Sequence, residues 1–195
     1  MRREMTPRER VITAMRRRKP DKVPKEASPT PAVYERFKQE TGRTDWAEYW
    51  GIEVRGVGFK PPEKLPDFRP FFDEELPEGT SFSEYGSARI PGTFYHFTRY
   101  RYPLDRAQSV ADLEAFPWPD FTPAYRHSHL EEDVARLHRE GWYVAGGVGH
   151  IFENAWQIRS MEALFEDMLC RPEMAAYILD RLTEDRAFMA LSLIH

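Results

Sequence analysis

The sequence predicts an α/β fold built on a parallel sheet, and three observations in its C-terminal half support this. Residues 142–145 form a short apolar run of the length expected for a buried strand. Helical patterns stand before and after this run, and the order helix, strand, helix is typical of βα units. A glycine-rich turn over residues 146–149 follows the strand. Because ligands of α/β folds bind where a strand ends, we expect part of any active site here.

The N-terminal part of the chain predicts three helices. Residues 6–9 form a capping box with proline at the first helical position, and the basic run 16–19 suits the last turn of this helix. A second helix begins at Pro31 and has Gly42 as its C-cap. Asp45 then caps a third, short helix.

Strands are also expected in this part of the chain. A short entering strand lies around Val23, and residues 51–59 and 93–102 form two further strands. We expect these two to pair with each other as an antiparallel excursion. Between them, residues 60–80 form a long loop that aromatic side chains hold in place. These aromatic residues are Phe68, Phe71 and Phe72.

The remaining helices frame the strand at residues 142–145. Ser109, with Asp112 three residues later, caps a short helix. Gly141 closes a longer helix that ends just before the strand. In chain order these helices are expected over residues 110–116, 123–140, 151–158 and 160–169, and from residue 172 onward.

The composition excludes several classes of function. The net charge is −4, which gives no reason to expect nucleic acid or an anionic membrane as a partner. Cys170 is the single cysteine, so a disulfide framework is excluded and the reducing cytoplasm is the expected location. The sequence contains no run of about 18 apolar residues, so no membrane span is predicted.

The histidines are the first candidates for acid–base or metal chemistry. His127, His129 and His138 are expected on a solvated surface, and His96 among packed aromatic residues. His150 follows the glycine-rich turn, where a functional role and a role as a helix cap both remain open. No cysteine and histidine spacing of a metal site occurs, and we assign no metal ligands.

Glu153 and Trp156 follow His150 at helical spacing, so the three side chains share one face. A carboxylate and an imidazole on one face can transfer a proton or bind a polar substrate edge. We therefore assign His150, Glu153 and Trp156 to substrate binding and leave the catalytic residues unassigned. In the alternative interpretation Glu153 pairs with Arg159 and Trp156 lies in the core. Asp167 is expected on a solvated face.

Three stretches of the chain, in their order and spacing, resemble the uroporphyrinogen decarboxylase family. The first covers residues 5–24, with its Lys-Pro-Asp-Lys-Val-Pro turn, and the second covers residues 109–120. The third begins at residue 149 with Gly-His-Ile-Phe-Glu-Asn-Ala-Trp and continues to residue 173. The resemblance implies a (β/α)8 TIM barrel, of which residues 1–195 form the incomplete N-terminal portion. A helical N-terminal extension and a β-rich insertion over residues 51–104 complete this expectation.

The last residues are apolar and helical in pattern without a capping residue, which favours a fragment that ends inside a helix. An incomplete barrel is expected to be inactive alone and poorly soluble, because it exposes sheet edges and apolar faces. The complete protein is expected to form a homodimer.

The resemblance implies two chemistries. One branch of the family decarboxylates a tetrapyrrole without a cofactor, and the other transfers methyl groups between corrinoid proteins and thiols with zinc. The arginine-rich motif of the decarboxylases is replaced here by residues 25–30, Lys-Glu-Ala-Ser-Pro-Thr. We therefore expect a corrinoid-linked methyltransferase acting on a small molecule, with zinc and a corrinoid partner in the complete protein. Decarboxylation of a tetrapyrrole and a non-catalytic binding role are the alternatives.

Overall fold

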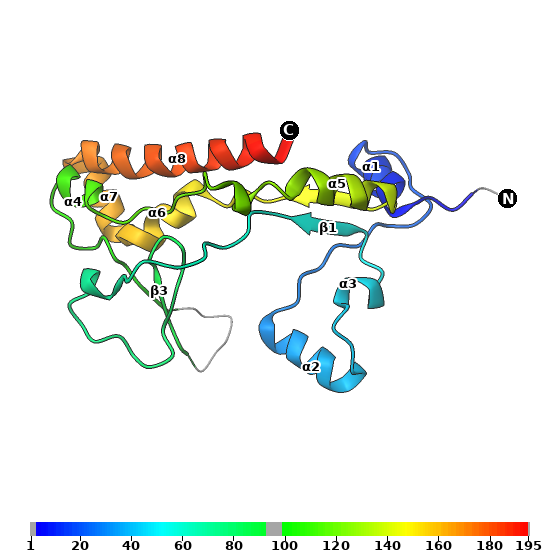
Figure 1. The fold of residues 1–195 in the computed structure, drawn as a ribbon, viewed down its shortest axis with the longest axis horizontal. Coiled ribbons are helices and arrows are strands. Elements are labelled where there is room, and N and C mark those ends of the chain that lie inside the picture. Colours follow the sequence, from blue (N-terminus) through cyan, green and yellow to red (C-terminus); the bar gives the residue numbers. More distant parts are fainter. Residues whose placement is uncertain (1–2, 93–98, 195) are drawn as a thin grey trace. The chain divides into compact units, whose positions relative to one another are not determined.

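A computed structural model describes residues 3–92 and 99–194, which divide into two compact units (Figure 1). The first unit contains residues 3–58 and 128–147, and the second contains residues 59–92, 99–127 and 148–194. The described strands form a parallel pair and a three-stranded antiparallel sheet, neither of which is a closed barrel. Mixed α and β structure confirms the predicted α/β class.

The first unit is built on the parallel pair β1 (Val54–Val57) and β5 (Tyr143–Gly146). Helices α1 and α5 pack against these two strands. The helices of this unit are α1 (Pro7–Met15), α2 (Pro31–Thr41), α3 (Trp46–Tyr49) and α5 (Leu130–Arg139). For the described residues, the expected antiparallel pairing of residues 52–59 with residues 93–102 is wrong, because residues 99–101 pair with residues 88–90. Residues 93–98 of that expected strand lie outside the described residues. An alternating pattern fixes which face of a strand is buried, but not which strand lies beside it.

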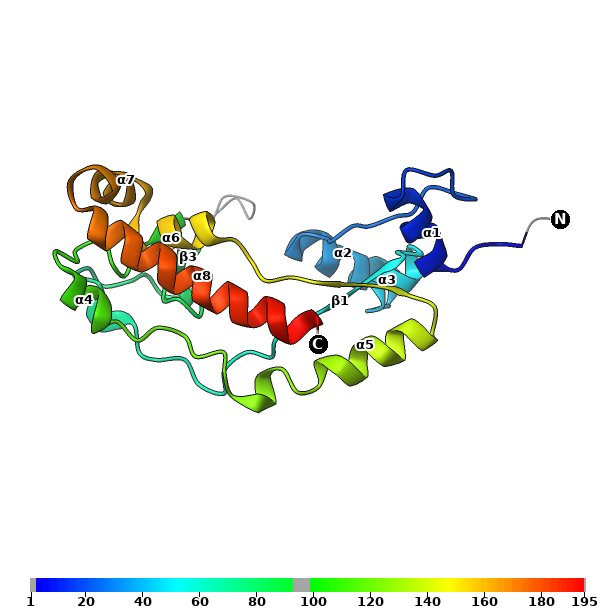
Figure 2. The same cartoon turned by 90° about the horizontal axis from the view of Figure 1, so that it is seen from above.

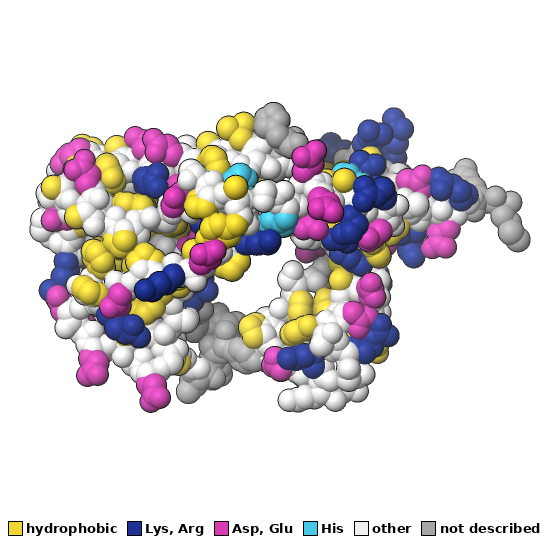
Figure 3. Space-filling model, viewed as in Figure 1, with side chains coloured by type: hydrophobic (Ala, Val, Ile, Leu, Met, Phe, Trp, Pro, Cys, Tyr) yellow, Lys and Arg dark blue, Asp and Glu magenta, His cyan; other side chains and the backbone are white. Residues whose placement is uncertain are grey.

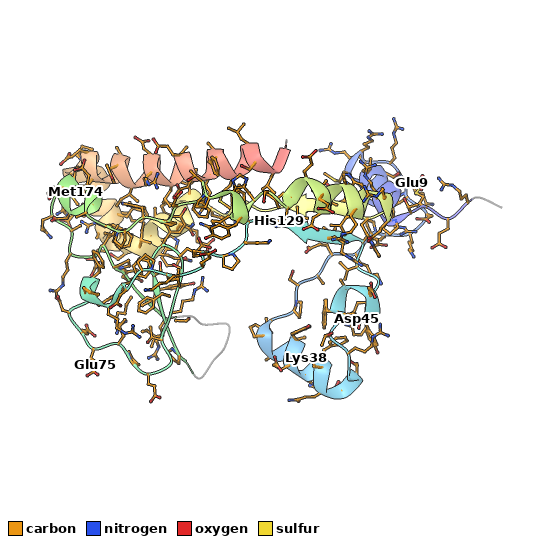
Figure 4. The ribbon with its side chains drawn as sticks, viewed as in Figure 1. Glu9, Lys38, Asp45, Glu75, His129 and Met174 are labelled. Carbon is orange, nitrogen blue, oxygen red and sulfur yellow. The ribbon has the colours of Figure 1, made fainter. Side chains whose placement is uncertain are left out.

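The capping box of α1 is confirmed. The backbone N–H of Glu9, labelled in Figure 4, donates to Thr6 Oγ1 at 3.2 Å, and the Thr6 N–H donates to Glu9 Oε2 at 2.9 Å. The basic run 16–19 lies beyond the helix, which ends at Met15, so its prediction as the last turn is wrong. Arg17 adopts a left-handed conformation with φ of 56°, which stops the helix before the following proline does.

Arg10 is the buried centre of the first unit. Its Nε lies 2.6 Å from Asp21 Oδ1 and its Nη1 lies 3.0 Å from Glu53 Oε1, which ties α1 to the segment before β1. The hydrogen bond from Arg10 lowers the pKa of Asp21. The strand expected around Val23 is wrong, since this segment has no regular structure and the Val23 side chain is 82% exposed.

Aromatic contacts connect α2 with α3. The Phe37 ring meets the rings of Trp46 and Tyr49 edge-on, each at a centroid distance of 5.2 Å. Gly42 ends α2 with φ of 67°, as predicted. Asp45, labelled in Figure 4, precedes α3 but makes no side-chain cap, because its carboxylate binds Arg43.

The second unit is organised along the long helix α8 (Pro172–Ile194), seen from above in Figure 2. Helices α4, α6 and α7 pack against α8. The other elements are η1 (Arg69–Phe71), β2 (Ser81–Phe82), β3 (Ala88–Ile90), β4 (Arg99–Arg101), α4 (Val110–Glu114), η2 (Ala124–Arg126), α6 (Ile151–Arg159) and α7 (Met161–Cys170). The helix expected over residues 123–140 is therefore wrong at its start, because only η2 forms before α5.

An apolar cluster forms the core of the second unit. Its fully buried members include Phe68, Leu113, Ile158, Leu164, Ile178 and Leu182. Phe68 stacks on Phe116 at a centroid distance of 5.8 Å, which confirms that aromatic side chains hold the loop over residues 60–80. A Cβ atom at Gly86 would lie 2.6 Å from the Phe68 ring, so a larger residue there would displace this contact.

A buried ion pair joins α6 to α7. Arg159 Nε lies 2.7 Å from Asp167 Oδ2, and Arg159 Nη2 lies 3.1 Å from Asp167 Oδ1. Asp167 has no exposed surface, so its predicted place on a solvated face is wrong. The alternative pairing of Glu153 with Arg159 is also wrong, because Asp167 takes the guanidinium.

Ser160 is the single residue between α6 and α7. It has the unusual backbone angles φ 67° and ψ 155°, and its Oγ accepts a hydrogen bond from the Ala163 N–H at 3.2 Å. The same residue therefore ends one helix and caps the next.

Apolar side chains, yellow in Figure 3, reach the surface of each unit. Phe152 and Phe165 stack at a centroid distance of 6.1 Å while remaining 45% and 47% exposed. Among the described residues, no helix has the length and apolar character needed to cross a membrane.

We predict that Asp167→Asn lowers the free energy of unfolding by about 3–5 kcal/mol, because it leaves the buried Arg159 charge without a carboxylate. Chemical denaturation measures this change. Glu166→Gln is the matched control, since its exposed carboxylate pairs only with Arg171 at 3.3 Å, and it should change stability by about 1 kcal/mol or less. Equal effects of the two variants would contradict the role of the buried pair.

Candidate functional site

The assigned substrate-binding residues lie on the first turns of α6. His150 is the N-cap of this helix, with extended backbone angles, and its side chain makes no capping hydrogen bond. The alternative role as a helix cap is thus borne out in position, through the backbone and not through the imidazole. The glycine-rich turn before it ends in Gly149, which has φ of 75° and turns the chain into the helix.

A row of polar contacts runs along α6. His150 Nε2 lies 3.9 Å from Glu153 Oε2, and the Gln157 side-chain amide donates to Glu153 Oε1 at 3.1 Å. The same amide lies 3.4 Å from the Tyr100 hydroxyl, and the Tyr100 ring meets Trp156 edge-on at 5.5 Å. The structure thus brings His150 and Glu153 together as predicted and adds two residues to them.

Gln157 and Tyr100 were not predicted as part of this face. Gln157 follows Glu153 at the i, i+4 spacing of helix neighbours, so the sequence contains a signal for it. Tyr100 comes from β4, and no local pattern connects it to α6.

The face is open to solvent at its N-terminal end. The side chains of His150 and Glu153 are 79% and 50% exposed, whereas Trp156 is half-buried against the core. An exposed pair at this distance contributes little stability, so both groups are free to meet a ligand. A polar substrate edge can bind the exposed carboxylate and imidazole, beside the flat surface of Trp156, while the buried Gln157 amide orients the carboxylate.

The other histidines occupy different surroundings. His138 is exposed as predicted, but His127 and His129 are partly buried, so their predicted solvated positions are wrong. His127 packs between the rings of Phe59 and Phe188 at 5.3 and 5.5 Å. His129, labelled in Figure 4, places Nε2 3.2 Å from the Gly58 carbonyl oxygen. His96 and His195 lie outside the described residues.

A cavity of about 820 Å³ lies in the first unit, between the α2–α3 segment and the parallel strands. Three carboxylate residues line it, Glu26, Glu35 and Asp45, together with Arg55. The Arg55 guanidinium lies 3.6 Å from the Trp142 ring centroid and donates to the Ile52 carbonyl at 2.6 Å. Burial lowers the pKa of Arg55. The rest of the lining is largely apolar, so its charged groups are three carboxylates and one guanidinium, which do not suit a ligand with a cluster of carboxylates.

A buried polar pair in the second unit was not predicted. The Tyr85 hydroxyl donates to Asp185 Oδ2 at 2.8 Å, and burial raises the pKa of both groups. Asp185 stands in the stripe of α8 that otherwise carries Ile178, Leu182 and Met189. A carboxylate within the apolar stripe of a helix indicates a buried polar contact, and the sequence contains this signal.

Within the described ranges, no three His, Cys, Asp or Glu side chains converge on a point that could hold a metal ion. Cys170 is exposed at the end of α7. The α6 face offers an imidazole and a carboxylate, which can bind a ligand or transfer a proton.

We predict that His150→Ala changes the free energy of unfolding by about 0.5 kcal/mol or less, because the side chain is exposed and caps nothing. Trp156→Ala, on the same face, should cost about 2 kcal/mol or more, since it removes a ring packed on the core. Thermal and urea unfolding of both variants measure the difference. A large loss with His150→Ala would show that His150 has a structural role.

We predict that Asp185→Asn stabilises the protein relative to the unchanged chain by an amount that grows with pH. The folded-state pKa of Asp185 is raised above its ordinary value of 3.8, so ionising this carboxylate weakens the fold as pH rises through that window. Asparagine does not titrate and still accepts from Tyr85. Melting temperatures of both proteins from acidic to neutral pH test this, and a constant difference would contradict it.

Comparison of the chain with protein-family models, with curated proteins and with solved structures finds no match.

Proposed function

We propose that this chain is the N-terminal portion of an α/β enzyme of the uroporphyrinogen decarboxylase family, and that its polar face on α6 binds a small-molecule substrate. The observation that carries the proposal is the row His150, Glu153 and Gln157 along α6. This helix follows the glycine-rich turn after a parallel strand, which is where α/β enzymes bind their ligands. In this proposal the complete fold is a (β/α)8 barrel.

Within that family we propose methyl transfer rather than decarboxylation. A tetrapyrrole substrate of a decarboxylase carries many carboxylates, which require cationic partners. Residues 25–30 supply one lysine, and its Nζ donates to the Trp50 carbonyl oxygen. The charged residues that line the cavity beside this segment are three carboxylates and one arginine. Both observations favour a substrate with few negative charges.

The role of this chain in the proposed reaction is to bind and orient the substrate. Glu153 accepts hydrogen bonds from a polar substrate edge, His150 donates or accepts one proton there, and Trp156 covers an apolar face. The described residues do not fit a zinc site, so the proposal derives no step through the metal. Zinc and a corrinoid protein belong to the remainder of the proposed enzyme, which we place in the cytoplasm as a homodimer.

The test is an assay of the complete enzyme with two substrates. Methylcobalamin with a small thiol reports methyl transfer through its change in absorbance, and uroporphyrinogen reports decarboxylation through its products. We predict activity in the first assay alone. Glu153→Gln should lower kcat/KM about tenfold by weakening a charge-assisted hydrogen bond, whereas the exposed control Glu166→Gln should leave it unchanged.

Each other result contradicts a different part of the proposal. Activity with uroporphyrinogen alone would establish decarboxylation. No activity in either assay would favour a non-catalytic binding protein. If the Glu153→Gln variant were as active as the unchanged enzyme, the α6 face would not be part of the substrate site.

A further inference from the structure

Arg186 on α8 is a buried cation without a carboxylate partner among the described residues. Its exposed fraction is 8%, and its Nε is buried without a hydrogen-bond partner. Its Nη1 lies 3.4 Å from Met189 Sδ, and the guanidinium stands 5.2 Å from the Tyr85 ring centroid. Neither neighbour neutralises the charge.

The other buried arginines among the described residues each have a carboxylate partner. Arg10, Arg126 and Arg159 each bind a carboxylate, at 2.6 Å from Asp21, 2.6 Å from Glu84 and 2.7 Å from Asp167. Burying a charge is costly unless a counter-charge and hydrogen bonds accompany it. Arg186 thus lacks the carboxylate partner that each of the other three buried arginines has.

The Arg186 guanidinium lies directly beneath the entrance to α6. A Cβ atom built on Gly149 would be 3.3 Å from Arg186 Cζ and 3.4 Å from its Nη2. Gly149 itself is exposed, so only the backbone of this glycine separates the guanidinium from solvent at this point. Any other residue there would place a side chain over the guanidinium.

The N-terminus of α6 adds a second positive feature at this place. No described group accepts a hydrogen bond from the backbone N–H groups of Ile151, Phe152 and Glu153, and His150 provides no side-chain cap. Free N–H groups and the helix dipole together attract an anion.

Asp185 and Glu153 have other partners than Arg186. Asp185 accepts from Tyr85 at 2.8 Å and lies 3.5 Å from Arg181. Glu153 is directed to Gln157 and His150. Two positive features therefore meet at Gly149, and no described carboxylate forms an ion pair or hydrogen bond with Arg186.

We infer that Arg186 and the N-terminus of α6 form a binding site for a small oxyanion, the carboxylate or phosphate group of a ligand. The planar guanidinium offers two parallel donors to such a group, and the helix offers backbone donors. This inference deepens the proposed substrate site by assigning one anionic group to the substrate. It rests on that site, but anion binding is measured without turnover, so either claim can fail alone.

The experiment compares the unchanged protein with Arg186→Met in a buffer without oxyanions and during titration with phosphate or acetate at constant ionic strength. Without an anion, Arg186→Met should melt at least as high as the unchanged protein, because it removes an unpaired buried charge. With the anion, only the unchanged protein should gain stability, with affinity reduced about tenfold or more in the variant.

Three further variants make the test specific. Gly149→Ala should weaken anion binding as strongly as Arg186→Met does, because its methyl group covers the guanidinium. Gly147→Ala and Arg181→Gln should leave binding unchanged, since no atom lies within 4 Å of a Cβ at Gly147 and Arg181 already pairs with Asp185.

Phosphate and acetate distinguish the two anionic groups that a ligand could present. Stabilisation by phosphate alone assigns a phosphate group, and stabilisation by acetate alone assigns a carboxylate. No stabilisation by either anion overturns the inference. A strongly lowered melting temperature of Arg186→Met without anions, or an equal loss of binding in Arg181→Gln, also overturns it.

Discussion

The buried ion pair of Arg159 and Asp167 is the constraint on which the second unit depends. Both side chains are fully buried, and the two parallel contacts fix their mutual orientation. Arg159 also donates to the carbonyl oxygen of Leu104, whose N–H donates to the Ile158 carbonyl at 2.8 Å. The pair thus holds α6, α7 and the segment before α4 in one arrangement.

This arrangement determines what α6 can present to a ligand. Because Arg159, Ile158 and Ala155 are buried, the helix can rotate little about its axis. The polar row from His150 to Gln157 is consequently held on one side, next to Tyr100. Binding groups on a fixed helix lose little conformational freedom when a ligand arrives, which favours affinity.

Features set by neighbouring residues could be predicted from the sequence. The capping boxes at Thr6 and Ser109 and the left-handed Gly42 follow from side chains and backbones within four residues. The shared face of His150 and Glu153 follows from helical spacing in the same way.

Features set by contacts between distant segments could not be predicted. Val54 and Tyr143 are neighbours in the parallel pair although 88 intervening residues separate them. Asp167 reads as a surface residue from its helix pattern alone, because nothing near it shows that Arg159 will turn toward it. Arg186 gives no local sign of its place beneath Gly149, since that contact joins α8 to the turn before α6, far away in the chain.

The joint at Ser160 has a consequence for the mechanics of the second unit. Its backbone angles belong to a region that glycine occupies without strain, yet glycine has no hydroxyl to cap α7. The chain therefore tolerates local strain in exchange for a defined start of the second helix. Because a single residue connects α6 and α7, the angle between the two helices can change little. A displacement at the His150 end of α6 would be transmitted as a tilt of α7, rather than absorbed by a flexible linker.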